Sequence, residues 1–182
     1  MKNLLAFLRE NTPNILADIQ SIVQIESPSH HTEGINRVQD LAQAWLGEFG
    51  MITRYPGDAG DVLLARIRGQ SAERVVLLAH VDTVHPIGSW SCLWRTEGDL
   101  GYGPGSYDMK AGVVQALWAL RAIHALGRQP AWSVDLLLTP DEETCSDAGR
   151  PYIEKYAQNA RAVLVLEAPF MNGDLKIARK GV

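Results

Sequence analysis

The sequence predicts an α/β fold in which a mostly parallel or mixed sheet is flanked by helices. Short apolar runs rich in Val and Leu, typical of buried strands, alternate with longer stretches whose apolar residues recur every three or four positions, typical of helices. Such alternation favours a sheet layered by helices. The 182 residues, 46% of them hydrophobic, suffice for one domain with a sizeable core.

Five stretches carry a helical pattern. Pro13 suits the first turn of a helix, and Ser27-Pro28-Ser29 ends that helix. Gly50 and Gly127 follow two later helices as C-terminal stops. The predicted helices cover residues 1–8 (an amphipathic surface helix), a stretch that begins at Asn11-Thr12-Pro13, residues 32–49, residues 109–126 and part of residues 149–158.

The strand patterns fall between these helices. A Pro-Gly-Asp turn at residues 56–58 joins the first two strands. Residues 83–107 are rich in Gly and Trp and read as a long irregular stretch, of the kind that is often functional. The predicted strands cover residues 51–55, 61–67, 75–79, 134–140, 162–166 and 174–182.

Charge and composition restrict the partners. The net charge of -4 provides no basic surface, so we expect no nucleic-acid partner. No apolar run approaches the ~20 residues that cross a bilayer, so we expect no membrane span. Cys92 and Cys145 are too few for a disulfide framework and read as reduced thiols of a cytoplasmic protein.

Three of the apolar runs end on residues that bind metals. One stops at His80, with Asp82 two positions on; another stops at residues 141–143, Asp-Glu-Glu; the third stops at Glu167. In open α/β sheets, ligands collect beyond the carboxyl ends of the strands, so these side chains are expected to converge. Carboxylates packed so closely repel one another, and a divalent cation is the simplest neutraliser.

Each signal also has a simpler interpretation. Asp82 can orient the far nitrogen of His80, or the pair can be a core histidine beside a turn aspartate. Residues 101–110 deliver Asp108 to the start of a helix, as a metal-bridging carboxylate, as part of a phosphate-binding glycine loop or as a helix N-cap. Among the adjacent acids Asp141-Glu142-Glu143, one carboxylate can bind metal while its neighbour faces the substrate as a base, or all three can belong to a solvated acidic turn. Glu167 is either a ligand or an exposed strand terminus.

The residue types indicate which metal fits. Carboxylates with one imidazole suit zinc, manganese or cobalt. Several carboxylates with a single histidine predict two ions about 3.5–4 Å apart, bridged by one carboxylate and one water.

Together these motifs resemble the co-catalytic dinuclear zinc exopeptidases. That family includes glutamate carboxypeptidase (carboxypeptidase G type), aminoacylase, acetylornithine deacetylase and succinyl-diaminopimelate desuccinylase, all with a zinc-exopeptidase fold. The matching stretches are Ser27-Pro28-Ser29, His80-Val81-Asp82-Thr83-Val84, residues 103–110, Asp141-Glu142-Glu143, Glu167-Ala168-Pro169 and residues 179–182, which resemble the family's entry into its lid domain.

The resemblance implies two Zn²⁺ ions, with Co²⁺ or Mn²⁺ as alternatives, and a role for each residue. It also implies a cis peptide bond after Asp108. In the implied site His80 and Glu167 bind the first ion, Asp82 orients His80, Asp108 bridges both ions, Glu143 binds the second ion and Glu142 is the general base.

By the same resemblance, residues 1–182 are the N-terminal portion of the catalytic domain. The lid or dimerisation domain, and a C-terminal catalytic segment with a further zinc-binding histidine, are absent from this sequence. The complete protein is expected to form a homodimer through the lid, and these residues alone are expected to be inactive.

The function implied is zinc-dependent cleavage of an amide bond next to a free carboxylate in a small peptide, as in glutamate carboxypeptidase. The alternative within the family is an N-acyl amino acid deacylase or deacetylase. Outside it, a non-catalytic module of this fold would bind no metal. A nucleotide-binding domain using the glycines at 101–105 is disfavoured, because the nearby acids would repel phosphate.

Overall fold

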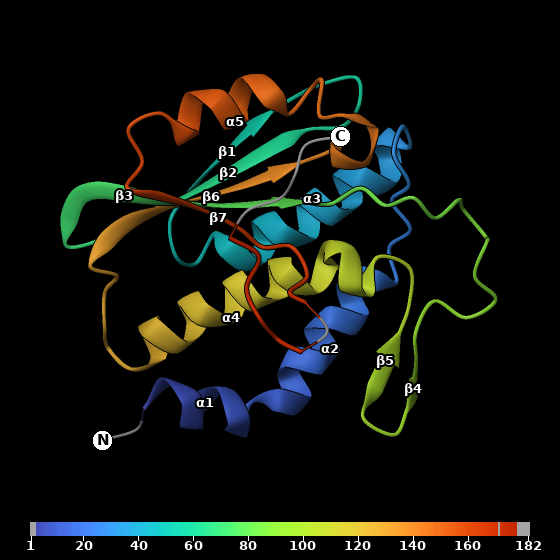
Figure 1. Cartoon of the computed structure of the whole chain (residues 1–182), viewed down its shortest axis with the longest axis horizontal. Helices are drawn as coiled ribbons and strands as arrows, with labels where there is room; N and C mark the ends of the chain where they lie inside the picture. Colours follow the sequence, from blue (N-terminus) through green and yellow to red (C-terminus); the bar gives the residue numbers. More distant parts are fainter. Residues whose placement is uncertain (1–2, 171, 178–182) are drawn as a thin grey trace.

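The structure is a computed structural model that describes residues 3–170 and 172–177. Its elements follow the predicted alternation of helices and strands (Figure 1). In chain order they are α1 (Leu4–Glu10), α2 (Thr12–Val23), α3 (Thr32–Leu46), β1 (Met51–Tyr55), β2 (Val62–Ile67), β3 (Ser71–His80), β4 (Arg95–Glu97), β5 (Leu100–Tyr102), a kinked turn η1 (Ser106–Lys110), α4 (Ala111–Ala125), β6 (Trp132–Thr139), a 3₁₀ turn η2 (Glu142–Thr144), α5 (Arg150–Ala157) and β7 (Ala162–Val165).

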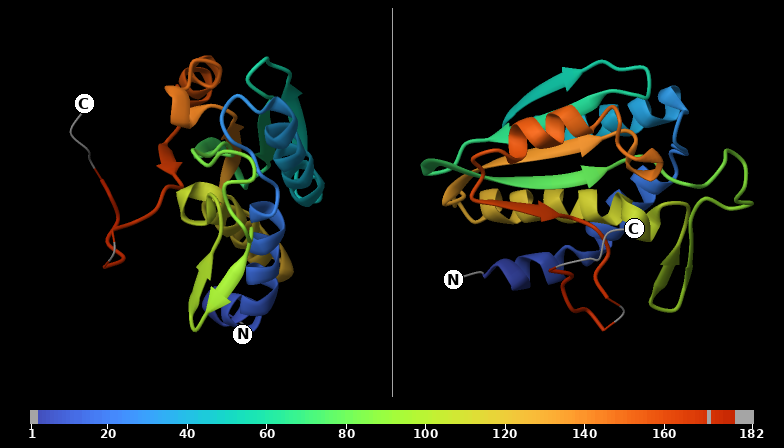
Figure 2. Two further views of the ribbon diagram at one scale, coloured as in Figure 1. Left: turned by 90° about the vertical axis from the view of Figure 1, so that its right-hand side faces the viewer. Right: turned by 45° about the horizontal axis from the view of Figure 1, so that its top comes forward.

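Within the described residues, five strands form one mixed sheet, in the order β1-β2-β6-β3-β7. The β1–β2 and β2–β6 pairs are antiparallel, whereas β6–β3 and β3–β7 are parallel. The mixed sheet flanked by helices confirms the predicted fold class. A separate two-stranded hairpin of β4 and β5 projects from the body of the molecule (Figures 1 and 2).

Helices cover both faces of the sheet, and the alternation of side chains along the strands explains why. Leu63 and Ala65 of β2 face the larger core, which includes residues of α2, α3 and α4. Val62 and Leu64 face the opposite way, into a smaller core that includes Tyr156 of α5. The two layers are seen above and below the sheet in Figure 1.

The three parallel strands end at the same edge of the sheet. His80, the last residue of β3, is the register partner of Thr139, the last residue of β6. On the other side, Leu78 of β3 pairs with Val165 of β7. The segments that follow β3, β6 and β7 therefore begin close together in space.

Two of the predictions about local structure were wrong. The stretch at 83–107 is not wholly irregular, because it contains the β4–β5 hairpin. Residues 174–177 form no strand, and the remainder of that predicted strand, residues 178–182, lies outside the described residues. Within the described part of the chain, no helix is both long and apolar enough to cross a bilayer.

Candidate metal centre

His80 stands at the centre of the converging side chains. It is 1% exposed. Its Nδ1 lies 3.0 Å from the main-chain oxygen and 3.2 Å from Oδ1 of Asp82. Its Nε2 faces three carboxylates, at 3.1 Å from Asp108 Oδ1, 3.2 Å from Glu167 Oε1 and 3.8 Å from Glu142 Oε2. One nitrogen is thus used for orientation, and the other points into the crevice.

Asp82 joins His80 to the acidic turn that follows β6. Its carboxylate is fully buried. It accepts hydrogen bonds from the main-chain N–H groups of Glu142 (3.1 Å) and Glu143 (3.2 Å), and from the hydroxyl of Ser29 (2.7 Å). Burial alone would raise the pKa of Asp82, but the hydrogen bonds from His80 and Ser29 and the charge of His80 lower it.

Asp108 reaches the crevice from the turn η1 that precedes α4. The turn begins after Gly105, which has a φ of 69° and leaves no room for a Cβ, since one would lie 2.4 Å from Thr83 Cγ2. The Asp108–Met109 peptide bond is cis, as the family resemblance implied. Met109 is buried beneath the site, where its sulfur accepts a hydrogen bond from the main-chain N–H of His80.

Glu167 reaches the crevice from the segment just after β7. The strand is held in place by β3, and the N–H of Leu166 donates to the main-chain oxygen of Leu78 at 2.9 Å. Helix α4 packs directly against this point, because a Cβ at Gly112 would lie 2.2 Å from the Leu166 oxygen. The absence of a side chain at Gly112 therefore lets the start of α4 and the end of β7 meet.

The electrostatics of the cluster favour a bound cation. Burial alone would lower the pKa of His80, but its contacts with Asp82 and Glu167 raise it to about 11. Hydrogen bonding to His80 lowers the pKa of Glu167. Burial and the surrounding carboxylates raise the pKa values of Glu142 and Glu143. Without metal, a proton on His80 therefore supplies the positive charge that these acids require.

The donor atoms also have the spacing that metal ions need. His80, Glu142 and Glu167 form one group, and His80, Asp108 and Glu143 form a second, each with ligand atoms within 4.8 Å of one another. Because His80 Nε2 can bind only one ion, carboxylates must supply the rest of the second site. The residue types and the spacing fit zinc or a similar divalent cation.

All six residues singled out from the sequence lie together, whereas two neighbouring residues were given no role. Ser29 was noted only as part of Ser27-Pro28-Ser29, and nothing local indicates that it contacts Asp82. Lys110 was noted only as part of the glycine-rich motif. It is fully buried, donates to the main-chain oxygen of Ile25 at 2.6 Å, and its pKa is lowered to about 7 by burial.

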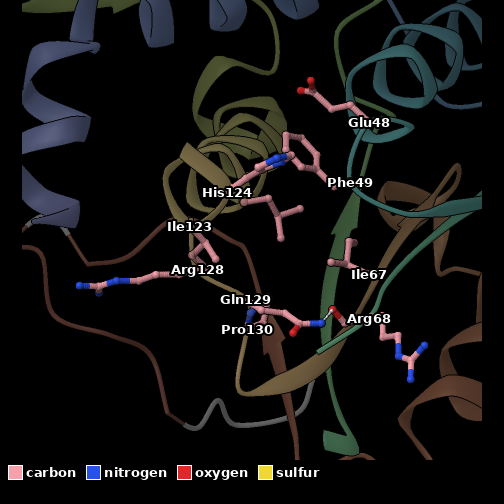
Figure 3. A pocket seen from close by; sticks show the side chains of 10 residues that line it. Glu48, Phe49, Ile67, Arg68, Ile123, His124, Arg128, Gln129 and Pro130 are labelled. Carbon is pink, nitrogen blue, oxygen red and sulfur yellow. Dashed lines mark hydrogen bonds between the residues drawn. The ribbon is translucent and has the colours of Figure 1, made fainter. Parts of the chain in front are cut away.

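A separate cavity of about 220 Å³ lies between the end of α4 and the segment that precedes β6, away from the acidic cluster (Figure 3). Two of its lining residues, Phe49 and His124, pack edge to face against each other, at 5.7 Å between ring centroids. Arg68 and Arg128, which also line it, point in different directions. None of the predicted site residues lines this cavity.

Comparisons with known proteins place the motifs in a family. The profile of peptidase family M20/M25/M40 matches residues 76–179. Carboxypeptidase G2 of Pseudomonas sp. (strain RS-16) is 29% identical over 174 residues, which are 93% of this chain and 42% of that protein. Succinyl-diaminopimelate desuccinylase of Rhodopseudomonas palustris (strain BisA53) is 30% identical over 156 residues, which are 80% of this chain and 40% of that protein.

Solved structures show the same fold. Human carnosine dipeptidase 1 superposes with a TM-score of 0.78 and 18% sequence identity, over 89% of this chain and 40% of that chain. The present chain therefore spans about two fifths of the length of the relatives it matches.

The buried amine of Lys110 predicts a pH dependence of stability. Between pH 7 and pH 10.5 the unfolded chain holds a proton on Lys110 that the folded chain has lost. Lys110 therefore adds to the free energy of unfolding as the pH rises through this range. Urea unfolding at pH 7 and pH 10 is expected to show that the free energy of unfolding of the wild type rises with pH relative to that of Lys110→Met. The comparison of the two proteins cancels the opposite contribution of His80, whose pKa is raised to about 11. An unchanged difference between the two proteins would contradict the burial of a neutral amine.

Proposed function

The chain belongs to peptidase family M20/M25/M40, and on that premise we propose that the complete protein is a zinc-dependent hydrolase. It cleaves an amide bond next to a free carboxylate in a small peptide, in the manner of a glutamate carboxypeptidase. The observation that carries the proposal is the meeting of His80 with four carboxylates at the ends of three parallel strands. The match to carboxypeptidase G2 over 93% of the chain supports it.

We assign two zinc ions to these residues, with Co²⁺ or Mn²⁺ as alternatives. His80 and Glu167 would hold the first ion, Glu143 would bind the second, and Asp108 would serve as a ligand of both. Asp82 keeps the His80 ring oriented through Nδ1, so that Nε2 is free for metal. When bound, zinc lowers the pKa of water and polarises the carbonyl of the substrate.

Glu142 is the proposed general base. Its pKa is raised by burial and by Glu167, Asp82 and Asp108, which brings it closer to the range useful for proton transfer. Its main-chain N–H is held by Asp82 at 3.1 Å, so the backbone from which its side chain extends is fixed. Glu142 takes a proton from the attacking water and passes it to the leaving amine.

The substrate has room beside the acidic cluster. An open groove of about 560 Å³ adjoins Glu143 and is lined in part by His30, Val84, Pro86 and Ile87. The first candidate for the occupant of this groove is a small peptide, the substrate of the proposed carboxypeptidase. An N-acyl amino acid is the second candidate, favoured by the 30% identity to a succinyl-diaminopimelate desuccinylase.

The remaining proposals concern the rest of the protein. Residues 1–182 form the N-terminal portion of the catalytic domain, and a lid domain and a C-terminal catalytic segment complete it, with dimerisation through the lid. The relatives' greater lengths support this division. A cytoplasmic location is supported by the two exposed, unpaired cysteines Cys92 and Cys145.

Metal binding is the first test. Zn²⁺ titration of the metal-free chain, by competition with a chromophoric chelator, is expected to show binding that is lost in His80→Ala and in Asp108→Ala, since each substitution removes a ligand. His124→Ala on α4 and Asp99→Ala, in the exposed turn between β4 and β5, are matched controls that should bind as the wild type does. Unchanged affinity in both site variants would refute the metal centre.

Catalysis by Glu142 requires the complete protein. Glu142→Gln keeps the shape of the side chain but cannot accept the proton. General-base catalysis typically contributes 10²–10⁴-fold, so kcat should fall by that factor, or about 3–5 kcal/mol of barrier. Zinc content, measured by atomic absorption, should not change. Near-normal turnover in this variant would remove Glu142 from the mechanism.

For the 182 residues alone we expect little or no hydrolysis, because one metal site lacks a ligand and the lid is absent. Release of amino acid from N-acyl amino acids, followed by liquid chromatography with zinc added, measures this directly. Robust turnover by the isolated chain would show that these residues already hold a complete active site.

A further inference from the structure

Asp82 does more than orient His80. Oδ1 lies 3.2 Å from Nδ1 of His80 and accepts the N–H of Glu142, while Oδ2 accepts the N–H of Glu143 and the hydroxyl of Ser29. One buried carboxylate therefore fixes a histidine ring and the main chain of Glu142 and Glu143. Its rotation about the Cβ–Cγ bond would disturb all of these contacts at once.

Ser29 makes the shortest of these contacts. The Ser29 Oγ–Asp82 Oδ2 distance is 2.7 Å, against 3.1–3.2 Å for the other three. Within the described residues, the side chains that hydrogen-bond to Asp82 are those of His80 and Ser29. Because the His80 ring is itself the group to be oriented, Ser29 is the independent side-chain anchor of the carboxylate.

The hydroxyl of Ser29 is held in place by the segment that carries Asp82. Thr83 donates its N–H to Ser27 O at 2.9 Å, and Ser29 donates its N–H to Thr83 O at 3.1 Å, so the two stretches run side by side. The hydroxyl of Ser27 donates to Val81 O at 2.7 Å. Ser27 thus secures the backbone, whereas Ser29 reaches the carboxylate.

We propose that Ser29 is a positioning residue of the metal centre, which sets the orientation of Asp82 and through it that of His80. The inference rests on the proposed function, because it concerns the affinity of the same site for zinc. Without the hydroxyl, Oδ2 keeps only the N–H of Glu143, and the carboxylate loses the anchor that opposes rotation. Outer contacts of this kind typically affect metal affinity by 10–100-fold.

The test compares Ser29→Ala, Ser29→Thr and the matched control Ser27→Ala in the chain of 182 residues. Zn²⁺ affinity is measured by chelator competition, and the thermal unfolding midpoint is measured without metal. Ser29→Ala is expected to bind zinc about 10-fold more weakly or worse. Ser29→Thr, which keeps a hydroxyl, is expected to recover most of the affinity. Ser27→Ala is expected to lower the unfolding midpoint while retaining near wild-type affinity.

The outcomes separate the two proposals. If the wild type binds no zinc, the proposed metal centre fails and the role of Ser29 fails with it. If the wild type binds and Ser29→Ala binds equally well, the centre stands and only Ser29 is refuted. If Ser27→Ala weakens binding as much as Ser29→Ala does, or if Ser29→Thr recovers nothing, the loss comes from the structure of the segment, and positioning by the hydroxyl is refuted.

Discussion

Four carboxylates share one crevice with a single buried imidazole, and their mutual repulsion is the constraint on which the site depends. Two unit charges about 4 Å apart, at an effective dielectric constant of about 20, repel by about 4 kcal/mol. In each of the two groups, His80 with Glu142 and Glu167 and His80 with Asp108 and Glu143, the donor atoms lie within 4.8 Å of one another. Positive charge must therefore be present, either as a proton on His80 or as a metal ion that replaces it.

The fold meets this constraint by supplying the ligands from separate elements, each held by its own main-chain contacts. His80 and the turn at Glu142 follow the two strands with the most extensive pairing in the sheet, β3 and β6. Asp108 lies in the turn η1, which also contains the buried residue Met109. Since main-chain contacts outside the crevice fix the backbone from which each acid extends, the carboxylates are held near one another despite their repulsion. Their preorganisation is what makes the pocket selective for a cation.

Much of this could be predicted from the sequence, because the pattern is local. The apolar runs that end on His80 and Glu167 predict both a strand and the residue at its carboxyl end. The second of these strands, β7, was expected to be buried but lies at the sheet edge with its last three residues exposed. The parallel register then brings those ends together. The β4–β5 hairpin was missed, because its three-residue strands are exposed and carry no apolar alternation. Residues 174–182 were predicted to be a strand, but residues 174–177 form no strand in the described structure.

The contacts of Ser29 and Lys110 could not be predicted for a different reason. Each joins segments more than 50 positions apart, through one hydroxyl or one amine. A polar side chain next to a helix end is ordinarily solvated, so its burial becomes evident only when the tertiary structure places a backbone oxygen or a carboxylate beside it. The local sequence pattern therefore identifies the metal ligands. Residues such as Ser29, which position those ligands, become evident only from long-range packing.

Strand β7 has a consequence for handling the molecule. Among the residues that the structure describes, it pairs with β3 alone, and Val163, Leu164 and Val165 are exposed by 38%, 52% and 56%. An unpaired edge with branched apolar side chains and no proline or lysine is a template for joining strands of other molecules. The isolated 182-residue chain will accordingly tend to self-associate as its concentration rises. Additives that mask strand edges will extend the concentration range over which it stays monomeric.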